Sequence, residues 1–515
     1  MNRLKIFHPF LFALFPVFFL YANNKDLVHP SYAFWPLIII LLLSIAVFLL
    51  IEHFLRNIQK AAILSSAFFI TFFSFGHYLK LPYLIFEEMP FKNLDYYCLF
   101  AFWIVLLAVI TCLVVKSKRS FKKITAYLNT VSIILLIMPI STIAWYEISA
   151  KNIDELIKNE NSLTDVKNTN NKPDIYYIVL DGYGRNDVLQ KYYGFDIGSF
   201  IKDLEDRGFF VAEKGTTNYP QTYLSIASSL NYAYLDELSQ VMGADSGNRG
   251  PLREMIKESR VYKTLKTAGY KFVAFPYTWT GTYDNLHADI FMQNKINTTE
   301  FTDLLVQSTP LRIFSNKNLF LEGYRNKFYF AFDHLPDIAK IETPTFVYVH
   351  LLIPHPPFVF DEGGAIEKME SDLAGNDGNH YFEKCPGVDK YKKAYVDQTK
   401  FASKNSLKTI DSILSKSSTP PIIILQADHG PGSMLDWEDP DKTNMHERMS
   451  ILNAYYLPDK GKKMLYDSIT PVNTFRVVFN TLFDADLELL EDKNYFSRWN
   501  HPYDFIDVTK KVNSQ

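Results

Sequence analysis

Three apolar runs after residue 170 end in residues that can bind metal ions or anions. The runs cover residues 175–180, 345–353 and 421–427. The polar residues within or just after them are Asp181, His350, His355, Asp428 and His429. Carboxylate oxygens and imidazole nitrogens together suit Zn²⁺ or Mn²⁺. Each residue alone also fits an ordinary turn or a buried polar group, but their combination predicts a divalent-metal site.

A hydroxyl that such a metal could activate lies between the first two runs. In NYPQTYLSIASSLN, residues 218–231, turn-forming residues precede small and hydroxyl-bearing ones, so we expect a helix to begin at Thr222. A hydroxyl at a helix amino terminus can attack a phosphorus or sulfur centre when a metal lowers its pKa. Thr222 could also serve only as a helix cap, and the local pattern by itself favours that role.

The elements that must position these residues follow an α/β pattern. Unbroken apolar strands indicate burial on both faces, as in a parallel sheet between helices. Helical periodicity is found between the strands at residues 200–207, 252–268 and 391–414. Strands that alternate with helices predict an α/β fold with a mostly parallel central sheet. Ligands of such sheets bind beyond the carboxyl ends of the strands, which is where the polar residues lie.

The first 150 residues have a different character. Five apolar runs are each long enough to cross a bilayer as a helix: Leu4–Tyr21, Ala33–Ile51, Ala61–Leu79, Tyr97–Val115 and Ala126–Trp145. The first run could be a signal peptide, but it lacks a small-residue cleavage site and four further runs follow it. We therefore expect a five-span transmembrane domain at 1–150, a polar linker at 151–172 and an exported domain at 173–515.

Charge predicts the orientation of these spans. Residues 1–150 hold 12 of the 53 Lys and Arg and 6 of the 56 Asp and Glu, a net charge of +6, which leaves −9 for the remainder. The basic residues concentrate before the first run and in alternate loops, which predicts a cytoplasmic amino terminus. An odd number of spans then places the exported domain outside, in the periplasm or at the outer surface of a bacterium. The acidic second half argues against nucleic-acid binding.

The ordered segments IVLDGYGRNDVL, NYPQTYLSIASSLN, VHLLIPHPPF and LQADHG resemble the sulfatase-like branch of the alkaline phosphatase superfamily. With the preceding spans, the chain looks like the lipoteichoic acid synthases and the lipid A phosphoethanolamine transferases. The resemblance implies that Asp181, Thr222, Asp428 and His429 bind the metal and that Thr222 is the nucleophile. It also implies contact of His350 and His355 with the transferred head group, although Ile353 and Pro354 replace the Gly-Ser of the transferase segment.

His446 is a further candidate from the resemblance. It follows His429 by 17 residues, near the place where cofactor-independent phosphoglycerate mutases have a ligand for a second metal. It could bind substrate phosphate instead, or have no role. A formylglycine-type sulfatase is disfavoured because the matching segment Ser308-Thr309-Pro310-Leu311-Arg312 lies 127 residues after Asp181, far from the expected nucleophile.

These features predict an enzyme of the bacterial inner membrane with a phospholipid donor. It would transfer phosphoethanolamine or phosphoglycerol to an envelope glycan or lipid through a phospho-threonine intermediate. A membrane-anchored hydrolase of phosphodiesters or sulfate esters is the nearer alternative, because water could replace the acceptor. A lipid-sensing regulator without catalysis is the second alternative, against which the presence of Asp181, Thr222, Asp428 and His429 argues.

Overall fold

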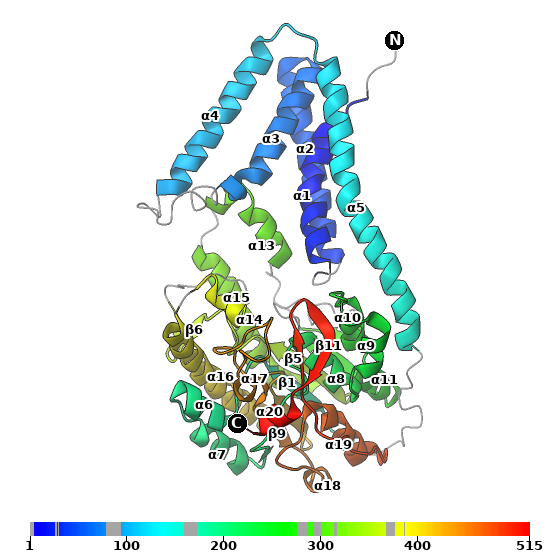
Figure 1. The fold of residues 1–515 in the computed structure, drawn as a ribbon, viewed down its shortest axis with the longest axis vertical. Coiled ribbons are helices and arrows are strands. Elements are labelled where there is room, and N and C mark those ends of the chain that lie inside the picture. Colours follow the sequence, from blue (N-terminus) through cyan, green and yellow to red (C-terminus); the bar gives the residue numbers. More distant parts are fainter. Residues whose placement is uncertain are drawn as a thin grey trace. The chain divides into compact units, whose positions relative to one another are not determined.

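A computed structural model describes residues 5–25, 28, 30–78, 94–158, 172–275, 287–292, 300–313, 317–366, 376–385 and 387–514. The chain divides into two compact units (Figure 1). Unit 1 comprises Met1–Asn152 and Ile296–Gly323, and unit 2 comprises Ile153–Lys295 and Tyr324–Gln515.

Unit 1 is helical. Its elements are α1 (His8–Asn24), α2 (Ser31–Leu55), α3 (Ile58–Tyr78), α4 (Leu94–Lys116), most of α5 (Lys122–Lys158), α13 (Glu300–Gln307) and the 3₁₀ helix η2 (Pro310–Ile313). Four stretches are long and apolar enough to cross a membrane: Ser31–Leu55, Ile58–Tyr78, Tyr97–Lys116 and Lys122–Ile148. Because α1 has only 17 residues, the structure supports four of the five expected spans, and the fifth stays a prediction.

Polar contacts tie α1 to two of the apolar helices. The Asn129 side chain of α5 accepts a hydrogen bond from the His8 backbone N–H at 3.1 Å, which satisfies a donor that the start of a helix leaves open. His8 Nδ1 lies 2.6 Å from Ser66 Oγ of α3. Ala13 and Val17 are buried in the same apolar cluster as Phe69 of α3. The first apolar run is therefore an integral part of unit 1.

Unit 1 also contains a segment from the second half of the sequence. Phe301 and Leu305 of α13 belong to the apolar cluster that includes Val17 and Phe69. Just after α13, the Ser308 carbonyl accepts a hydrogen bond from the Gly76 N–H at 2.9 Å. The expected exported domain at 173–515 thus includes a stretch that packs with the amino-terminal helices. The expected linker also begins within α5, which continues to Lys158.

Unit 2 is built on a seven-stranded sheet with the order β2-β9-β8-β1-β5-β3-β4. The strands are β1 (Ile175–Leu180), β2 (Phe210–Val211), β3 (Lys271–Phe275), β4 (Ile290–Phe291), β5 (Thr345–Leu351), β8 (Ile422–Gln426) and β9 (Asn453–Tyr456). The strands from β8 to β4 pair in parallel, whereas β9 runs antiparallel to β8 and to β2. The predicted α/β fold with a mostly parallel sheet is confirmed.

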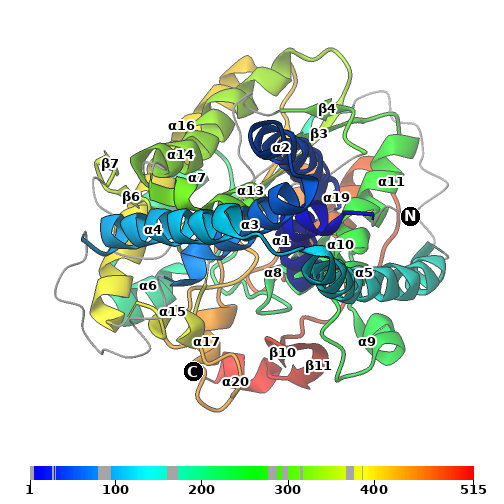
Figure 2. The same ribbon diagram turned by 90° about the horizontal axis from the view of Figure 1, so that it is seen from above.

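Helices cover both faces of this sheet. In both views α16 and α7 lie on one side of it, while α11 and α19 lie on the other (Figures 1 and 2). Tyr177 of β1 contacts the helices on the α19 side of the sheet, with its hydroxyl 2.9 Å from Ser229 Oγ of α8 and its ring against Phe475 of α19. The helices of unit 2 are α6 (Asn186–Tyr193), α7 (Gly198–Asp206), α8 (Thr222–Asn231), α9 (Asp236–Met242), α10 (Gly250–Lys257), α11 (Arg260–Thr267), the 3₁₀ helix η3 (Leu335–Lys340), α15 (Asn379–Phe382), α16 (Val388–Lys416), α17 (Met445–Met449), α18 (Asp459–Lys462), α19 (Pro471–Phe483) and α20 (Thr509–Asn513).

One helix and two hairpins remain among the described elements. Helix α14 (Lys317–His334) crosses the boundary between the units. Two short hairpins are β6 (Phe360–Asp361) with β7 (Gly364–Ala365), and β10 (Tyr495–Arg498) with β11 (His501–Asp507).

The expected helices differ from the structure in one place. The periodic stretch at 252–268 forms two helices, α10 and α11, where a single one was predicted. The break is at Ser259, whose hydroxyl accepts a hydrogen bond from the Tyr262 N–H and so caps α11. The stretches at 200–207 and 391–414 are helical within α7 and α16, apart from Arg207, which follows the end of α7.

Candidate metal centre and nucleophile

Three neighbouring strands bring the polar residues to one edge of the sheet. Asp181 directly follows β1, His350 is the penultimate residue of β5, and Asp428 comes two residues after β8. The strand register sets their positions along the strands, because Val179 of β1 pairs with both His350 of β5 and Gln426 of β8. Asp181 and Asp428 therefore each lie two residues beyond this paired level. The Gly182 N–H then donates to Asp428 Oδ1 at 3.1 Å and ties the first strand end to the third.

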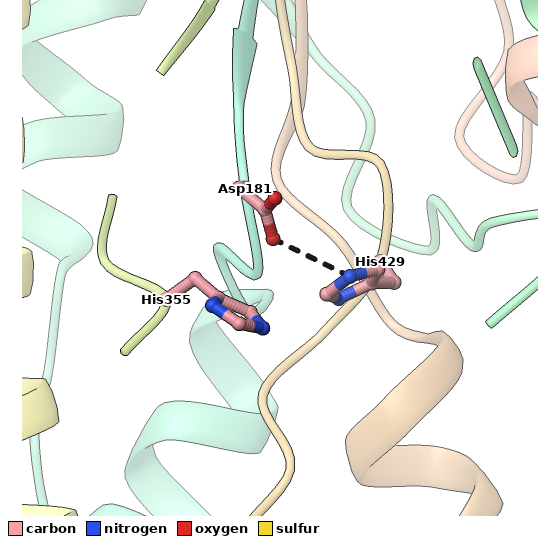
Figure 3. A group of neighbouring side chains, drawn as sticks. All are labelled: Asp181, His355 and His429. Carbon is pink, nitrogen blue, oxygen red and sulfur yellow. Dashed lines mark ion pairs between the residues drawn. The ribbon is translucent and has the colours of Figure 1, made fainter. Parts of the chain in front are cut away.

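Two sets of side chains at this edge have the geometry of metal ligands. One consists of Asp181, His355 and His429, the other of Asp181, His350 and Asp428, and within each set the ligand atoms lie within 4.8 Å of one another. All five residues are buried. Figure 3 shows the first set, with the imidazoles of His355 and His429 turned toward the Asp181 carboxylate.

The protonation of His429 leaves an electron pair facing the carboxylates. Its Nδ1 lies 2.9 Å from the Gly430 carbonyl oxygen, which can only accept, so Nδ1 carries the proton. Nε2 therefore presents its lone pair 3.3 Å from Asp181 Oδ1 and 3.4 Å from Asp428 Oδ2. These two oxygens are buried and accept no hydrogen bond within the part of the chain that the structure describes. Two carboxylate oxygens without a donor among the described residues converge with the lone pair of Nε2, and this arrangement fits a cation between them.

The charge states also suit a metal, which needs ionised carboxylates and neutral imidazoles. Burial by itself would raise the pKa of Asp181, but the neighbouring His355 and His350 side chains outweigh burial and hold that pKa below its ordinary value. Burial lowers the pKa of His429, and the nearby positive charge of Arg448 lowers it further. His429 is therefore neutral at neutral pH, with Nε2 available as a ligand.

The predicted nucleophile meets this cluster. Helix α8 begins at Thr222, as the sequence predicted, with extended Gln221 as its amino-terminal cap. Thr222 Oγ1 lies 3.2 Å from His429 Nε2. Its side chain is therefore directed at the candidate ligands and at the same time sits where the open N–H groups of α8 favour negative charge.

The three predicted substrate contacts, His350, His355 and His446, have different neighbours. His350 is buried, and its Nε2 lies 3.1 Å from Asp181 Oδ2, so it contacts a candidate ligand. His355 Nδ1 lies 2.6 Å from the Pro356 carbonyl, which leaves Nε2 directed into the cluster. His446 belongs to neither ligand set, and its Nε2 lies 3.1 Å from Asp187 Oδ2.

Two buried residues of the site were missed by sequence reasoning. Asp377 Oδ2 lies 3.6 Å from His355 Nε2 and 2.6 Å from Arg448 Nη1. Burial would raise the pKa of Asp377, but Arg448, His355 and His429 reverse the effect and lower it. Neither residue directly follows an apolar run, and neither has a sequence spacing from the other motifs that indicates a function. The sequence therefore carries no signal that could have found them.

Comparison with known proteins gives similarities in structure only. No protein-family model matches the chain, and no curated protein matches it. Among solved structures, the chain is similar to the C-terminal periplasmic domain of EptC from Escherichia coli in complex with Zn, with 12% identity, a TM-score of 0.43 and coverage of 67% of this chain and 94% of that one.

Two further structures extend this comparison. The chain is similar to the integral membrane protein lipooligosaccharide phosphoethanolamine transferase A (EptA) from Neisseria meningitidis, with 10% identity, a TM-score of 0.40 and coverage of 94% of this chain and 95% of that one. It is also similar to a protein labelled 4S-sulf from a glycosaminoglycan-metabolism locus of Bacteroides thetaiotaomicron, with 13% identity, a TM-score of 0.37 and coverage of 66% and 84%.

Proposed function

We propose that this protein is a membrane-anchored, metal-dependent transferase. It moves a phospholipid head group, phosphoethanolamine or phosphoglycerol, to a glycan or lipid of the bacterial envelope. The observation that carries this proposal is the approach of Thr222 Oγ1 to within 3.2 Å of His429 Nε2, beside two carboxylate oxygens that accept no hydrogen bond from the residues that the structure describes. A nucleophile and a cation site in one place are what phosphoryl transfer requires.

Asp181, Thr222, Asp428 and His429 would hold the metal. When bound, Zn²⁺ or Mn²⁺ would supply Lewis acidity at this position. Thr222 Oγ attacks the phosphorus of the donor phosphodiester, the new Oγ–P bond forms, and the P–O bond to diacylglycerol breaks. The proton that Thr222 gives up ends on the diacylglycerol hydroxyl, and the head group remains on Thr222 as a phosphodiester. An acceptor hydroxyl next attacks that phosphorus, the Oγ–P bond breaks, and the proton of the acceptor hydroxyl ends on Thr222 Oγ.

Two buried histidines would assist this reaction, one by orienting Asp181 and the other by contacting the phosphoryl group. His350 holds the second oxygen of Asp181, which keeps the carboxylate pointed at the metal position. His355 presents Nε2 toward the cluster and would stabilise charge on the phosphoryl oxygens or accept the proton of the incoming hydroxyl. His446, whose Nε2 lies 3.1 Å from Asp187 Oδ2, would be a further substrate contact. If a second metal binds, His350 and His355 would be its additional ligands, since each belongs to one of the two ligand sets.

Attachment to the membrane gives a physical reason for the apolar helices. A lipid donor confined to the same surface as the enzyme meets the site at a high effective concentration. We propose that the amino terminus is cytoplasmic, that α1 completes five spans, and that unit 2 lies in the periplasm or outside. In a variant without the native cysteines, Lys214→Cys should react in intact cells with an impermeant maleimide, and Lys118→Cys should react only after lysis. The opposite pattern would reverse the orientation.

Mass spectrometry of the intact protein tests the reaction. After incubation of the detergent-solubilised full chain with Mn²⁺ or Zn²⁺ and either phosphatidylethanolamine or phosphatidylglycerol, we expect a head-group adduct on Thr222. The added mass identifies the donor. Absence of an adduct with both lipids, or an adduct on Ser225 in place of Thr222, would contradict the proposal.

The same experiment separates the alternatives. Stoichiometric release of free head group without any acceptor would identify a hydrolase with the same intermediate. If the protein shows neither metal binding nor an adduct, the lipid-sensing regulator is the alternative that remains. A formylglycine sulfatase would need Ser308 at the site, but Ser308 belongs to unit 1, where its carbonyl accepts from Gly76.

A further inference from the structure

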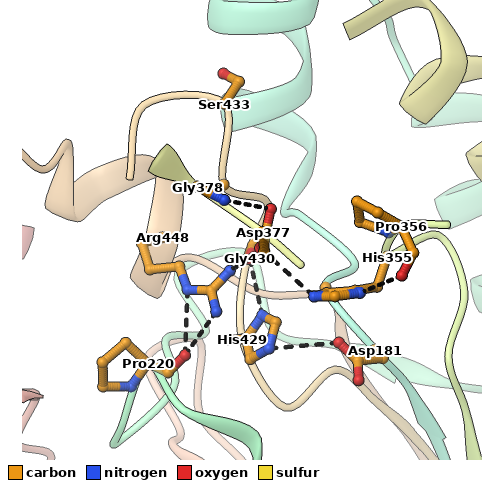
Figure 4. A network of polar contacts seen from close by, with 12 residues as sticks. Asp181, Pro220, His355, Pro356, Asp377, Gly378, His429, Gly430, Ser433 and Arg448 are labelled. Atoms are coloured by element: carbon orange, nitrogen blue, oxygen red, sulfur yellow. Dashed lines mark hydrogen bonds and ion pairs between the residues drawn. The ribbon is translucent and has the colours of Figure 1, made fainter. Parts of the chain in front are cut away.

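A single buried guanidinium links three segments that each carry a site residue (Figure 4). Arg448 is 1% exposed. It donates from Nε and Nη2 to the Pro220 carbonyl at 3.2 and 2.8 Å. Its Nη1 donates to the Gly430 carbonyl at 3.0 Å and to Asp377 Oδ2 at 2.6 Å.

Each of these acceptors stands next to a residue of the proposed chemistry. Pro220 comes two residues before Thr222. The Gly430 carbonyl also accepts from His429 Nδ1 at 2.9 Å, so it fixes both the imidazole and Arg448. The Asp377 oxygen that accepts from Arg448 lies 3.6 Å from His355 Nε2. One side chain thus links the nucleophile's loop, a proposed metal ligand and a proposed substrate contact.

Arginine suits this task for physical reasons. Its planar fork offers five N–H donors in fixed directions and stays charged at every accessible pH. The Trp437 ring, centred 5.0 Å from the guanidinium carbon, limits its tilt. On the other side, Asp377 accepts from Tyr391 at 2.8 Å and from the Gly378 N–H at 2.9 Å. The pair is therefore held rigidly at both ends.

We propose that Arg448, held by Asp377, is a positioning residue that sets the place of Thr222 relative to His429 and His355. This inference rests on the proposed function, because it assigns a role within the same site. Reaction rates are sensitive to such placement, since a misplacement of about 1 Å can cost on the order of 100-fold. Loss of Arg448 slows the attack of Thr222 while the binding of the lipid changes little.

The experiment must separate positioning from simple stability. Arg448→Met alone leaves the Asp377 charge buried without its partner, so that variant is expected to unfold easily. The double variant Arg448→Met/Asp377→Asn removes both charges and restores stability. Arg325→Met is the matched control, because Arg325 is also buried and donates to two backbone carbonyls, those of Val359 and Ile366, outside the candidate site.

The measurements use full-length protein and single-turnover formation of the Thr222 adduct. We expect the double variant to form the adduct about 100-fold more slowly than the wild type, with the half-saturating lipid concentration within about threefold and the Arg325→Met rate unchanged. Without added metal, hydrogen exchange of the 217–225 backbone should also be faster in the double variant than in Arg325→Met.

A double variant with wild-type stability, wild-type adduct rate and unchanged exchange at 217–225 would overturn the positioning role and reduce the pair to a structural one. If the wild type itself forms no adduct, the proposed function fails. The exchange measurement then still decides whether Arg448 holds the Thr222 loop.

Discussion

Asp181 and Asp377 are buried carboxylates of the same unit with opposite surroundings. Asp377 is saturated, since the Arg448 guanidinium, the Tyr391 hydroxyl and the Gly378 N–H all donate to it. Asp181 has one oxygen that accepts no hydrogen bond from any described residue and faces the lone pair of His429. Burial of an unpaired charge is costly. The contrast supports the two proposed roles, in which Asp377 holds Arg448 in place and Asp181 faces the proposed cation position.

The largest effect is expected at the open cluster. Thr222→Ala removes the attacking oxygen and should lower transfer by about 10⁴-fold or more, as the loss of a nucleophile does in other covalent mechanisms. Thr222→Ser keeps the hydroxyl and should retain measurable turnover. Initial rates of head-group transfer from labelled phospholipid measure both. Wild-type turnover by Thr222→Ala would break the assignment of the open cluster to catalysis.

A smaller effect, on stability, is expected at the saturated carboxylate. Asp377→Asn leaves the fully buried Arg448 without a counter-charge, which should cost about 3–5 kcal/mol. Asp411→Asn is the control, because its pair with Arg207 lies at the surface and should contribute at most about 1 kcal/mol. Unfolding midpoints from near-UV circular dichroism report both. Equal losses in the two variants would remove the distinction between a buried and an exposed pair.

The smallest effect concerns pH. Glu447 is buried, and burial raises its pKa despite hydrogen bonds from Ser433, Tyr193 and Met434. The folded protein then holds this proton to higher pH than the unfolded chain does. Glu447 therefore lowers stability as pH rises from its unfolded pKa through its higher folded pKa. Glu447→Gln should flatten that part of the curve of unfolding midpoint against pH, and parallel curves for the two proteins would contradict this.

The contrast between the two carboxylates also explains what the sequence could predict. Asp181, Asp428 and His429 directly follow apolar strands, and the carboxyl ends of parallel strands meet at one edge, so their convergence was predictable. Thr222 was predictable as the start of a helix after a turn-rich loop. Asp377 and Arg448 are 71 residues apart and belong to irregular or short segments. Only the folded chain brings them together, because no periodicity encodes a loop contact.

A similar limit applies to the domain boundaries. The apolar runs predicted the helices of unit 1, because span length and hydropathy are local properties. The packing of Phe301 and Leu305 with Val17 and Phe69 was not predicted, since an eight-residue amphipathic helix does not specify which core receives it. The break at Ser259 was missed because a cap depends on one side-chain hydrogen bond, which hydrophobic periodicity does not record.

Metal binding tests the central claim most directly. Isothermal titration of the metal-free, full-length protein with Zn²⁺ or Mn²⁺ should show binding to the wild type and to the surface variant Asp411→Asn, and affinity about 100-fold lower or undetectable for Asp428→Asn. The Asp428 variant should remain folded, because it removes one of the converging negative charges. An absence of binding by the wild type, or full affinity in Asp428→Asn, would contradict a metal site at this edge of the sheet.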